Sequence, residues 1–265
     1  MKNYENRIVL FLDLLAFKKQ INETIKDDRE IFEKTSFIIE TIKEMTDVAQ
    51  ESPKKTSKVV TQFSDSIVIS FKSDDKKEIP KIFFVLQKLI AKLIARDILC
   101  RGAISYGLLY HKNNMIFGPA LVDAYETESK AALYPRVILD KSVIDIMREN
   151  YVIMSKSSHP YRKIVFEEKV NSYLKTDTDD KFYIDYFSGA MIFYEGDDLF
   201  RIYRNLRKLI IKGLEHDNAN INIKFGWMKN KYNKLPESLT KINEEEDLFY
   251  KRPDIKNFFN EFKPI

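Results

Sequence analysis

The sequence predicts an α+β fold: a ferredoxin-like βαββαβ domain, in which an antiparallel sheet carries helices on one face, followed by a C-terminal helical pair. Two observations support the prediction. Apolar, β-branched segments and amphipathic segments alternate in the order strand, helix, strand, strand, helix, strand across residues 7–110. In addition, the two middle strands are separated only by Ser64 and Asp65, which is typical of a tight hairpin.

The first half of this pattern comes from residues 7–71. Residues 7–13 are a continuous apolar run, which predicts a strand buried on both faces. Residues 15–48 carry apolar side chains at roughly helical spacing and are predicted as one helix. Residues 58–63 and 66–71 then alternate apolar and small polar residues, as the two strands of a hairpin do.

The second half begins with an amphipathic helix. Pro80 lies near its beginning and the pattern ends at about residue 98, after which residues 101–110 form the fourth strand. A short hairpin is predicted at 112–117. A helix follows from Gly118 to about Ala131, and residues 136–140 are predicted as a further strand.

The chain is predicted to divide into a catalytic domain over residues 1–190 and a helical extension over 191–265. Two helices are expected in the extension, packed on the domain or on a dimer partner. The apolar face expected on the first of them comprises Phe200, Tyr203, Leu206, Leu209 and Ile210. No segment is typical of an effector domain, so any response to a reaction product is expected from a separate effector protein.

Composition narrows the class of protein. The 265 residues are 44% hydrophobic and 32% charged, as in an ordinary globular protein. The net charge of +4 is spread along the chain, which argues against a nucleic-acid partner. The single Cys100 cannot form an internal disulfide or a cysteine zinc site. Charged residues interrupt the most apolar helix, and no signal peptide is recognised, so we expect a cytoplasmic protein without a membrane span.

Two aspartates occupy positions where burial is expected. Asp13 ends the first strand, and Asp65 lies in the hairpin turn. A buried carboxylate requires a compensating partner, and neighbouring first and third strands would bring these two together. A shared Mg²⁺ or Mn²⁺ would compensate both charges, because these cations prefer oxygen ligands. Alternatively, Asp13 caps the helix that follows it.

Five segments in order carry a resemblance to a known family. "FLDLLAF" and "FSDSIVIS" resemble the two metal-binding segments of the class III nucleotidyl cyclases, and "RGAISYG" resembles their fourth strand. "GPALVDAYETES" and "PRVILD" resemble the helix and strand that follow in that family. The resemblance covers roughly residues 5–190. Within the superfamily it is strongest to the small bacterial pyrimidine cyclases of the Pycsar antiphage systems.

The resemblance implies a catalytic role for Asp13 and Asp65, which with Leu14 would hold two Mn²⁺ or Mg²⁺ ions. It also implies a nucleoside triphosphate substrate and a homodimer with composite active sites. The chain from Leu14 to Phe17 opens a helix whose N–H groups would favour phosphate; for Phe17, packing at the helix base is the alternative. The residues expected at the substrate are Phe17, Thr61, Ser64, Arg101, Asp123, Glu126 and Lys175. For Arg101 the alternative is a structural pair with a carboxylate, and for Lys175 it is a solvated loop position.

Three departures from the family pattern affect the substrate site. Thr61 replaces the Lys or Glu that reads a purine base, Val122 replaces an Asn, and Glu126 replaces the transition-state Arg. Two interpretations follow. The protein either cyclises UTP or CTP with a rearranged second half-site, as an antiphage second-messenger synthase, or it is a catalytically inactive module that binds nucleotide or a partner.

Overall fold

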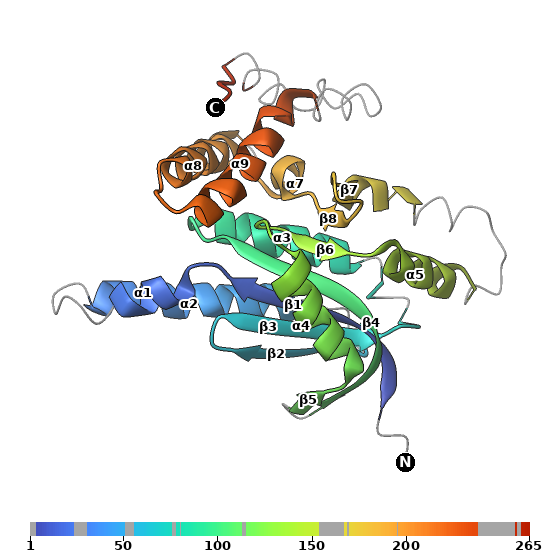
Figure 1. The fold of residues 1–265 in the computed structure, drawn as a ribbon. Helices are drawn as coiled ribbons and strands as arrows, with labels where there is room; N and C mark the ends of the chain where they lie inside the picture. The colour runs from blue at the N-terminus through green and yellow to red at the C-terminus, as the bar shows by residue number, and fades with distance from the viewer. Residues whose placement is uncertain are drawn as a thin grey trace.

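The computed structural model describes residues 4–23, 31–50, 56–75, 78–79, 81–112, 115–153, 167–168, 170–194, 196–237, 258 and 261–265. A mixed sheet runs through the molecule with strand order β2-β3-β1-β4-β6-β8-β7, and β5 pairs with β4 (Figure 1). The strands are β1 (Glu5–Leu14), β2 (Val59–Phe63), β3 (Ser66–Lys72), β4 (Cys100–Lys112), β5 (Met115–Phe117), β6 (Val137–Leu139), β7 (Leu174–Thr176) and β8 (Phe182–Ile184).

The order β2-β3-β1-β4 is that of a ferredoxin-like sheet, so the predicted fold class is confirmed. The β1–β3, β1–β4 and β2–β3 pairs are antiparallel, whereas β6 adds to β4 in parallel. The described helices are α1 (Phe17–Glu23), α2 (Ile31–Gln50), α3 (Lys81–Ala95), α4 (Pro119–Ala131), α5 (Lys141–Ile153), α7 (Tyr186–Phe193), α8 (Gly196–Leu214) and α9 (Ala219–Asn233).

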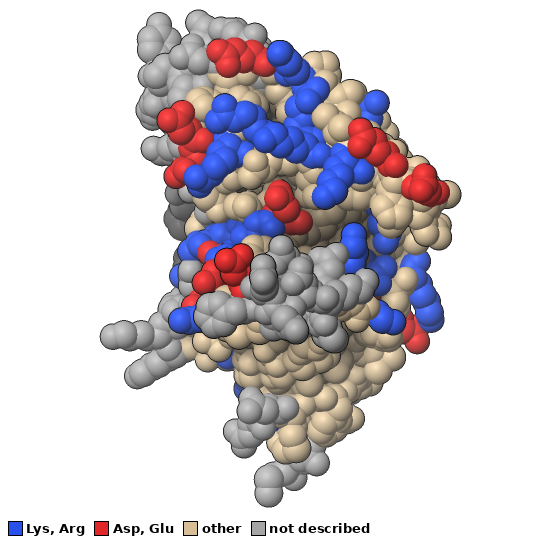
Figure 2. Space-filling model, turned by 90° about the vertical axis from the view of Figure 1, so that its left-hand side faces the viewer, with Lys and Arg blue, Asp and Glu red and all other residues tan. Residues whose placement is uncertain are grey.

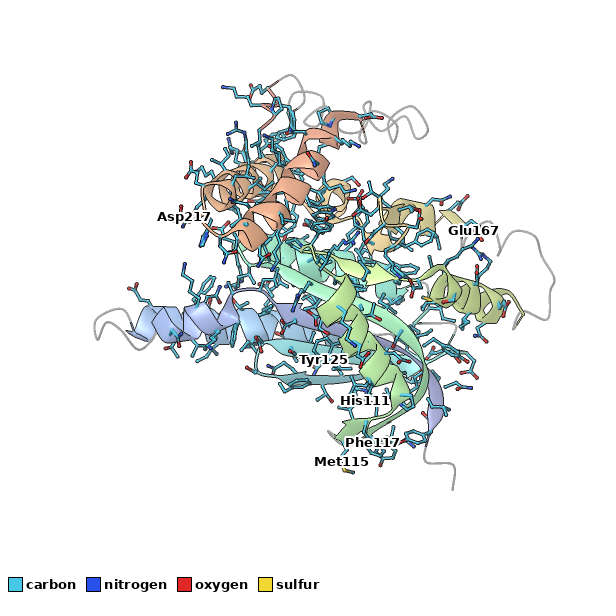
Figure 3. All side chains as sticks on the ribbon, in the orientation of Figure 1. His111, Met115, Phe117, Tyr125, Glu167 and Asp217 are labelled. Atoms are coloured by element: carbon cyan, nitrogen blue, oxygen red, sulfur yellow. The ribbon has the colours of Figure 1, made fainter. Side chains whose placement is uncertain are left out.

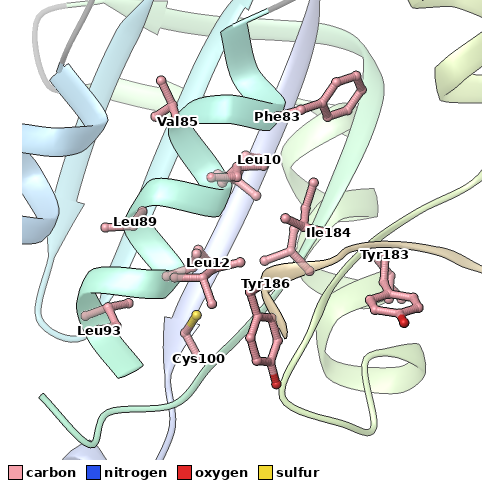
Figure 4. Close-up of a cluster of buried hydrophobic side chains, with 14 of the residues drawn as sticks. Leu10, Leu12, Phe83, Val85, Leu89, Leu93, Cys100, Tyr183, Ile184 and Tyr186 are labelled. Carbon is pink, nitrogen blue, oxygen red and sulfur yellow. The ribbon is translucent and has the colours of Figure 1, made fainter. Parts of the chain in front are cut away.

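Side chains of β1 alternate between two separate cores. Leu10 and Leu12 point into the main core beneath α3, where they meet side chains such as Leu89 (Figure 4). Val9 and Phe11 point to the opposite face and pack in a smaller cluster with residues of α4. The helices of the βαββαβ unit thus cover one face of the sheet, and α4, which follows that unit, lies on the other. Both faces of β1 are buried, as its apolar run predicts.

The prediction of a single helix over residues 15–48 is wrong. The structure has two helices, α1 and α2, and residues 24–30 between them lie outside the described part of the chain. Apolar periodicity alone does not separate two helices of similar phase.

Helix α8 joins the main core through the side chains of Leu199, Ile202, Tyr203, Leu206 and Ile210. This stripe is rotated from the predicted face, because Phe200 and Leu209 are only half-buried. Helix α9 packs beside α8 (Figure 1). None of the described helices is long and apolar enough to cross a membrane.

A buried polar cluster fixes α9 to the far end of the sheet. The side chain of Asp177 accepts hydrogen bonds from Arg136 Nη1 at 2.5 Å, Trp227 Nε1 at 2.7 Å and Lys231 Nζ at 2.9 Å. The indole of Trp227 also stacks on Tyr134, with ring centroids 5.3 Å apart. Through these contacts the orientation of α9 is set by the β7–β8 hairpin and the segment before β6.

Candidate functional site

The ends of β1 and β3 bring Asp13 and Asp65 together. The strands pair antiparallel with Asp13 opposite Ser66, so Asp65 is the next residue beyond the paired register. The backbone N–H of Leu14 donates to the carbonyl oxygen of Asp65 at 3.1 Å. On the other side of β1, Asp13 lies opposite Arg101 of β4. The two aspartates predicted from sequence are therefore neighbours at one edge of the sheet.

Two residues in the left-handed backbone region flank this pair. Ser64, directly before Asp65, has φ 51°, and Ala16, three residues after Asp13, has φ 64°. Residues other than glycine rarely adopt this backbone conformation, and those that do cluster at functional sites. The positive φ at Ser64 follows from the two-residue hairpin between β2 and β3, where Phe63 pairs with Ser66.

Glycine is needed where β4 passes β1 beside the site. A Cβ at Gly102 would lie 2.5 Å from the carbonyl oxygen of Phe11. Close approach of the two backbones therefore explains the glycine at position 102.

The electrostatics of the pair are those of crowded carboxylates. Burial raises the pKa of Asp13 above its ordinary value, and the nearby charge of Asp65 raises it further. The hydroxyl of Ser66, which donates to Asp13 Oδ1 at 3.0 Å, and the charge of Arg101 act in the opposite direction. A pair of carboxylates held this close gains stability from a bound cation.

The helix-capping alternative for Asp13 does not match the geometry. Helix α1 begins at Phe17, and the N–H groups of Lys19 and Gln20 donate to the carbonyl of Ala16. Ala16, rather than Asp13, therefore holds the capping position, and the hydrogen bond that Asp13 accepts comes from Ser66.

The donor set fits a hard divalent cation. Two carboxylates and the adjoining main chain at Leu14 supply oxygen ligands, which suit Mg²⁺ or Mn²⁺. Cys100 of β4 is the only thiol in the chain, and it is buried. Burial together with the charge of Asp13 raises its pKa to about 12, which disfavours the thiolate that would bind a metal. Within the residues that the structure describes, no group of three or more His, Cys, Asp or Glu side chains is placed to hold a metal ion, either here or elsewhere, so main-chain oxygen would have to complete the site.

Arg101 forms an ion pair with Glu128, the buried glutamate near the end of α4. The carboxylate of Glu128 is shielded from water, which raises its pKa, and the charge of Asp13 adds to this effect. Lys224 of α9 lies near the same pair. Its ammonium is half-buried, and burial followed by repulsion from Arg101 lowers its pKa.

Lys224 was missed by sequence reasoning. A signal existed, because Lys224, Trp227 and Lys231 follow the i, i+3, i+7 spacing of one helix face. The structure shows that Trp227 and Lys231 of this face bind Asp177, so the face is turned toward the sheet. The spacing alone did not reveal which part of the sheet Lys224 would approach.

The outer side of α4 is exposed. Ala120, Ala124 and Glu128 face the sheet, at the i, i+4, i+8 spacing of one helix face. Asp123 and Glu126 are exposed, and Glu126 pairs with Lys130 at 2.8 Å. These two predicted substrate contacts therefore point away from the aspartates of their own chain.

Thr61 lies on the same face of the sheet as the aspartates, within a polar network. Its Oγ1 is 2.8 Å from Nε2 of His111, a buried side chain on the part of β4 that leads to β5. Figure 3 labels His111 near the N-terminal end of α4, and Tyr125 farther along that helix. His111 was not predicted as a site residue, because it is separated from Thr61 by 50 residues.

The remaining predicted residues lie at different depths. Phe17 is buried in the main core, as the packing alternative expects, and Ser64 is exposed in the turn. Lys175 is exposed on β7, four strand positions from β1. At the usual spacing between strands this separation is on the order of 20 Å, so Lys175 does not reach the aspartates of its own chain.

Basic side chains gather above the site. The face of the molecule at this end of the sheet carries many Lys and Arg residues over α8 and α9 (Figure 2). The exposed basic residues of α8 are Arg201, Arg204, Lys208 and Lys212. A positive surface of this kind attracts anionic ligands toward the site.

Comparison with known proteins returns similarity to solved structures. Two structures of a bacterial light-regulated adenylyl cyclase match, at 16% identity over 54% of this chain (TM-score 0.40) and at 14% identity over 78% (TM-score 0.43). A class III adenylyl cyclase-like ATP-binding protein from Pseudomonas aeruginosa matches at 9% identity over 63% of this chain (TM-score 0.38).

The matched regions cover 45%, 58% and 40% of those three chains, so this chain spans about half of their length. No protein-family model matches, and the search of curated proteins gives no match. At these identities and TM-scores, similarity does not assign an activity. The activity is therefore inferred from the residues of the site.

Proposed function

We propose that the protein is a metal-dependent nucleotidyl cyclase that converts a nucleoside triphosphate, UTP or CTP, to its 3′,5′-cyclic monophosphate and pyrophosphate. The observation that carries the proposal is the meeting of Asp13 and Asp65 at adjacent strand ends. Burial, together with the nearby charge of Asp65, raises the pKa of Asp13, which makes its ionised form unfavourable without a cation. An inactive copy would have no need to keep this arrangement.

The reaction requires attack of the ribose 3′-oxygen on the α-phosphorus, with pyrophosphate as the leaving group. Two divalent ions held by Asp13, Asp65 and the main chain at Leu14 would supply Lewis-acid stabilisation of the attacking oxygen and the phosphates. Asp13 and Asp65 provide the negative charge for this binding. The hydroxyl of Ser66 orients Asp13 through its hydrogen bond.

Positive charge for the phosphates comes from the same end of the sheet. Arg101 lies opposite Asp13, and Lys224 approaches Arg101 from α9. The chain lacks the transition-state Arg of the family it resembles, since Glu126 stands at that position. Arg101 and Lys224 are the cations of this chain that we propose in its place.

We propose a homodimer with composite sites as the active unit. Asp123 and Glu126 point away from their own aspartates, so they can contact only a nucleotide held by another subunit. Around them, an apolar surface is exposed on α4, β4 and β5; it comprises Leu108, Met115, Phe117, Val122 and Tyr125. A two-fold pairing would bury this surface twice and create two equivalent clefts.

Pyrimidine specificity and an antiphage role with a separate effector protein rest on the sequence resemblance. The short Thr61 hydroxyl in place of a Lys or Glu favours a pyrimidine. We expect UTP or CTP to be cyclised at least about tenfold faster than ATP or GTP, which corresponds to roughly 1.4 kcal/mol in transition-state binding.

The test is incubation of the purified protein with each of the four NTPs and Mn²⁺ or Mg²⁺, with cyclic product identified by mass spectrometry. Asp65→Asn should abolish turnover and retain the fold, because it removes a metal ligand without changing side-chain size. Asp217→Asn, at an exposed loop position, is the matched control and should keep full activity.

Three results would contradict the proposal or a part of it. Near wild-type turnover by Asp65→Asn would remove the metal role of that residue. If no NTP is cyclised by the wild-type protein, a nucleotide- or partner-binding module becomes the better description. A measured preference for ATP or GTP would reject the pyrimidine assignment alone.

A further inference from the structure

A chain of hydrogen bonds runs from the buried Arg7 to the half-exposed Thr61. Arg7 Nε donates to Ser70 Oγ at 2.9 Å, and Ser70 Oγ lies 2.8 Å from His111 Nδ1. The other ring nitrogen, Nε2, lies 2.8 Å from Thr61 Oγ1. Arg7, Ser70 and His111 are each at most 2% exposed, so water does not compete for these bonds.

The direction of each bond follows from the donors available. Arg7 can only donate, so Ser70 Oγ accepts from it. Among the described residues, His111 Nδ1 is the acceptor available to the Ser70 hydroxyl hydrogen. His111 is uncharged at neutral pH, because burial and the charge of Arg7 lower its pKa to about 4. A neutral imidazole with an accepting Nδ1 carries its hydrogen on Nε2.

The same direction continues to Thr61. The Nε2–H group of His111 donates to Thr61 Oγ1, which leaves the hydroxyl hydrogen of Thr61 to donate elsewhere. No second partner for this hydroxyl occurs in the described part of the chain. Thr61 therefore presents a hydrogen-bond donor at the end of a directed chain, and bonds of such chains strengthen one another.

Thr61 is placed to meet the base of a nucleotide held at the aspartates. It pairs with Val68, which pairs with Phe11, two residues before Asp13 on β1. Thr61 thus shares the face of Asp13, two strands away and two residues back. Strand geometry makes this separation on the order of 12 Å, which an extended nucleoside triphosphate can span.

We propose that His111 acts as a positioning residue that fixes the Thr61 hydroxyl as a donor, and that this donor selects a base with a carbonyl group where cytosine and adenine carry an amine. The inference deepens the proposed function and rests on it. Within the pyrimidines it favours UTP over CTP. A cytosine amine facing Thr61 would leave the hydroxyl hydrogen without an acceptor.

The experiment compares kcat/KM for UTP and CTP in five proteins, the wild type and four variants. We expect the wild type to prefer UTP about tenfold. Thr61→Val keeps the side-chain shape and removes the hydroxyl, and His111→Leu removes the hydrogen bond that orients this hydroxyl. Both substitutions should bring the ratio close to one. Thr61→Ser should restore the preference. His216→Asn, at an exposed histidine, is the control and should leave the ratio unchanged.

A second measurement determines the tautomer of His111 in the hydrogen-bond chain and does not depend on turnover. Nitrogen NMR of the ¹⁵N-histidine-labelled wild type distinguishes the two neutral tautomers, with the His111 signal assigned as the one that remains in His159→Asn and in His216→Asn. The Nε2–H form at neutral pH is expected, and the Nδ1–H form would overturn the proposal even if the His111 variant does not fold. A preference for CTP, or a UTP preference that survives in Thr61→Val, would also overturn it.

Failure of the proposed function gives a different result. If no NTP is cyclised, calorimetric binding of UTP and CTP with Mg²⁺ replaces the kinetic ratio. Tighter UTP binding that Thr61→Val abolishes would keep this inference and reject cyclase activity. Equal binding, or no binding of either nucleotide, would reject both.

Discussion

At the residue scale, the site contains two kinds of polar side chain, which differ in how their polar groups are compensated. Asp13 and Asp65 are neighbouring carboxylates, and burial together with the charge of Asp65 raises the pKa of Asp13; in the proposed function a bound cation compensates them. His111 instead lies in a network of internal partners and remains uncharged. The proposed function therefore assigns the aspartates to a bound cation, whereas His111 has its hydrogen-bond partners within the chain.

The lowered pKa of His111 predicts a pH effect on stability. In the unfolded chain His111 takes up a proton near pH 6.5, but in the folded protein it does so near pH 4. Between these values the unfolded state binds more protons, so the free energy of unfolding decreases as the pH falls. The loss from pH 7 to pH 4 is roughly 3 kcal/mol.

The measurement is urea unfolding at several pH values. Between pH 7 and pH 4, the free energy of unfolding of the wild type should fall by roughly 3 kcal/mol more than that of His111→Asn. His216→Asn is the matched control. Parallel pH profiles for the wild type and His111→Asn would show that His111 is not held neutral.

At the element scale, a buried carboxylate anchors α9 to the far end of the sheet, in addition to the packing of α9 against α8 and the main core. Asp177 receives hydrogen bonds from Arg136, Trp227 and Lys231, and the guanidinium of Arg136 is fully shielded from solvent. Asp177→Ala would leave a buried cation with one partner fewer. The expected loss is about 3–5 kcal/mol in the free energy of unfolding.

Asp179→Ala is the control for this substitution. Asp179 also pairs with Arg136, at 2.5 Å, but its own side chain is 44% exposed. Its removal should cost roughly 1 kcal/mol or less, since exposed pairs contribute little. Equal losses for the two variants in chemical unfolding would contradict the anchor role of Asp177.

We expect a second residue of α9, Lys224, to affect activity. Because its ammonium lies near Arg101 at the aspartate end of the sheet, Lys224→Ala should lower kcat/KM for the cyclised NTP about tenfold, roughly 1.4 kcal/mol. Lys224→Arg should retain part of the activity. Lys229→Ala is the control on the same helix. Unchanged kinetics for Lys224→Ala would place the phosphate-binding cation elsewhere.

At the scale of the whole molecule, the proposed dimer predicts complementation between two inactive variants. Asp65→Ala removes the metal half of a cleft, and Asp123→Ala combined with Glu126→Ala removes the α4 half. Mixed dimers then contain one intact cleft. Half of the dimers in an equal mixture are mixed, so about a quarter of the wild-type activity should return.

Subunit exchange is verified independently, for example with differently tagged chains. Exchange without recovered activity would place the complete site within one chain. The exposed apolar surface around Val122 and Tyr125 would then need another explanation.

The sequence by itself determined the βαββαβ part of the sheet and the aspartate pair, whereas β7 and β8 were not predicted from it. Apolar alternation fixes which face each residue occupies, and the two-residue turn at Ser64 and Asp65 fixes the register of the hairpin, so Asp13 and Asp65 could be placed side by side. Local patterns of this kind act over a few residues and are visible in one chain.

Tertiary structure alone decided the contacts made over long separations. His111 reaches Thr61 and Ser70 because β4 extends beyond its pairing with β1, and Lys224 approaches Arg101 because Asp177 holds α9. The orientation of Asp123 and Glu126 likewise depended on which side of α4 packs against the sheet. These contacts join residues 40 or more positions apart or depend on helix packing, which apolar periodicity does not encode.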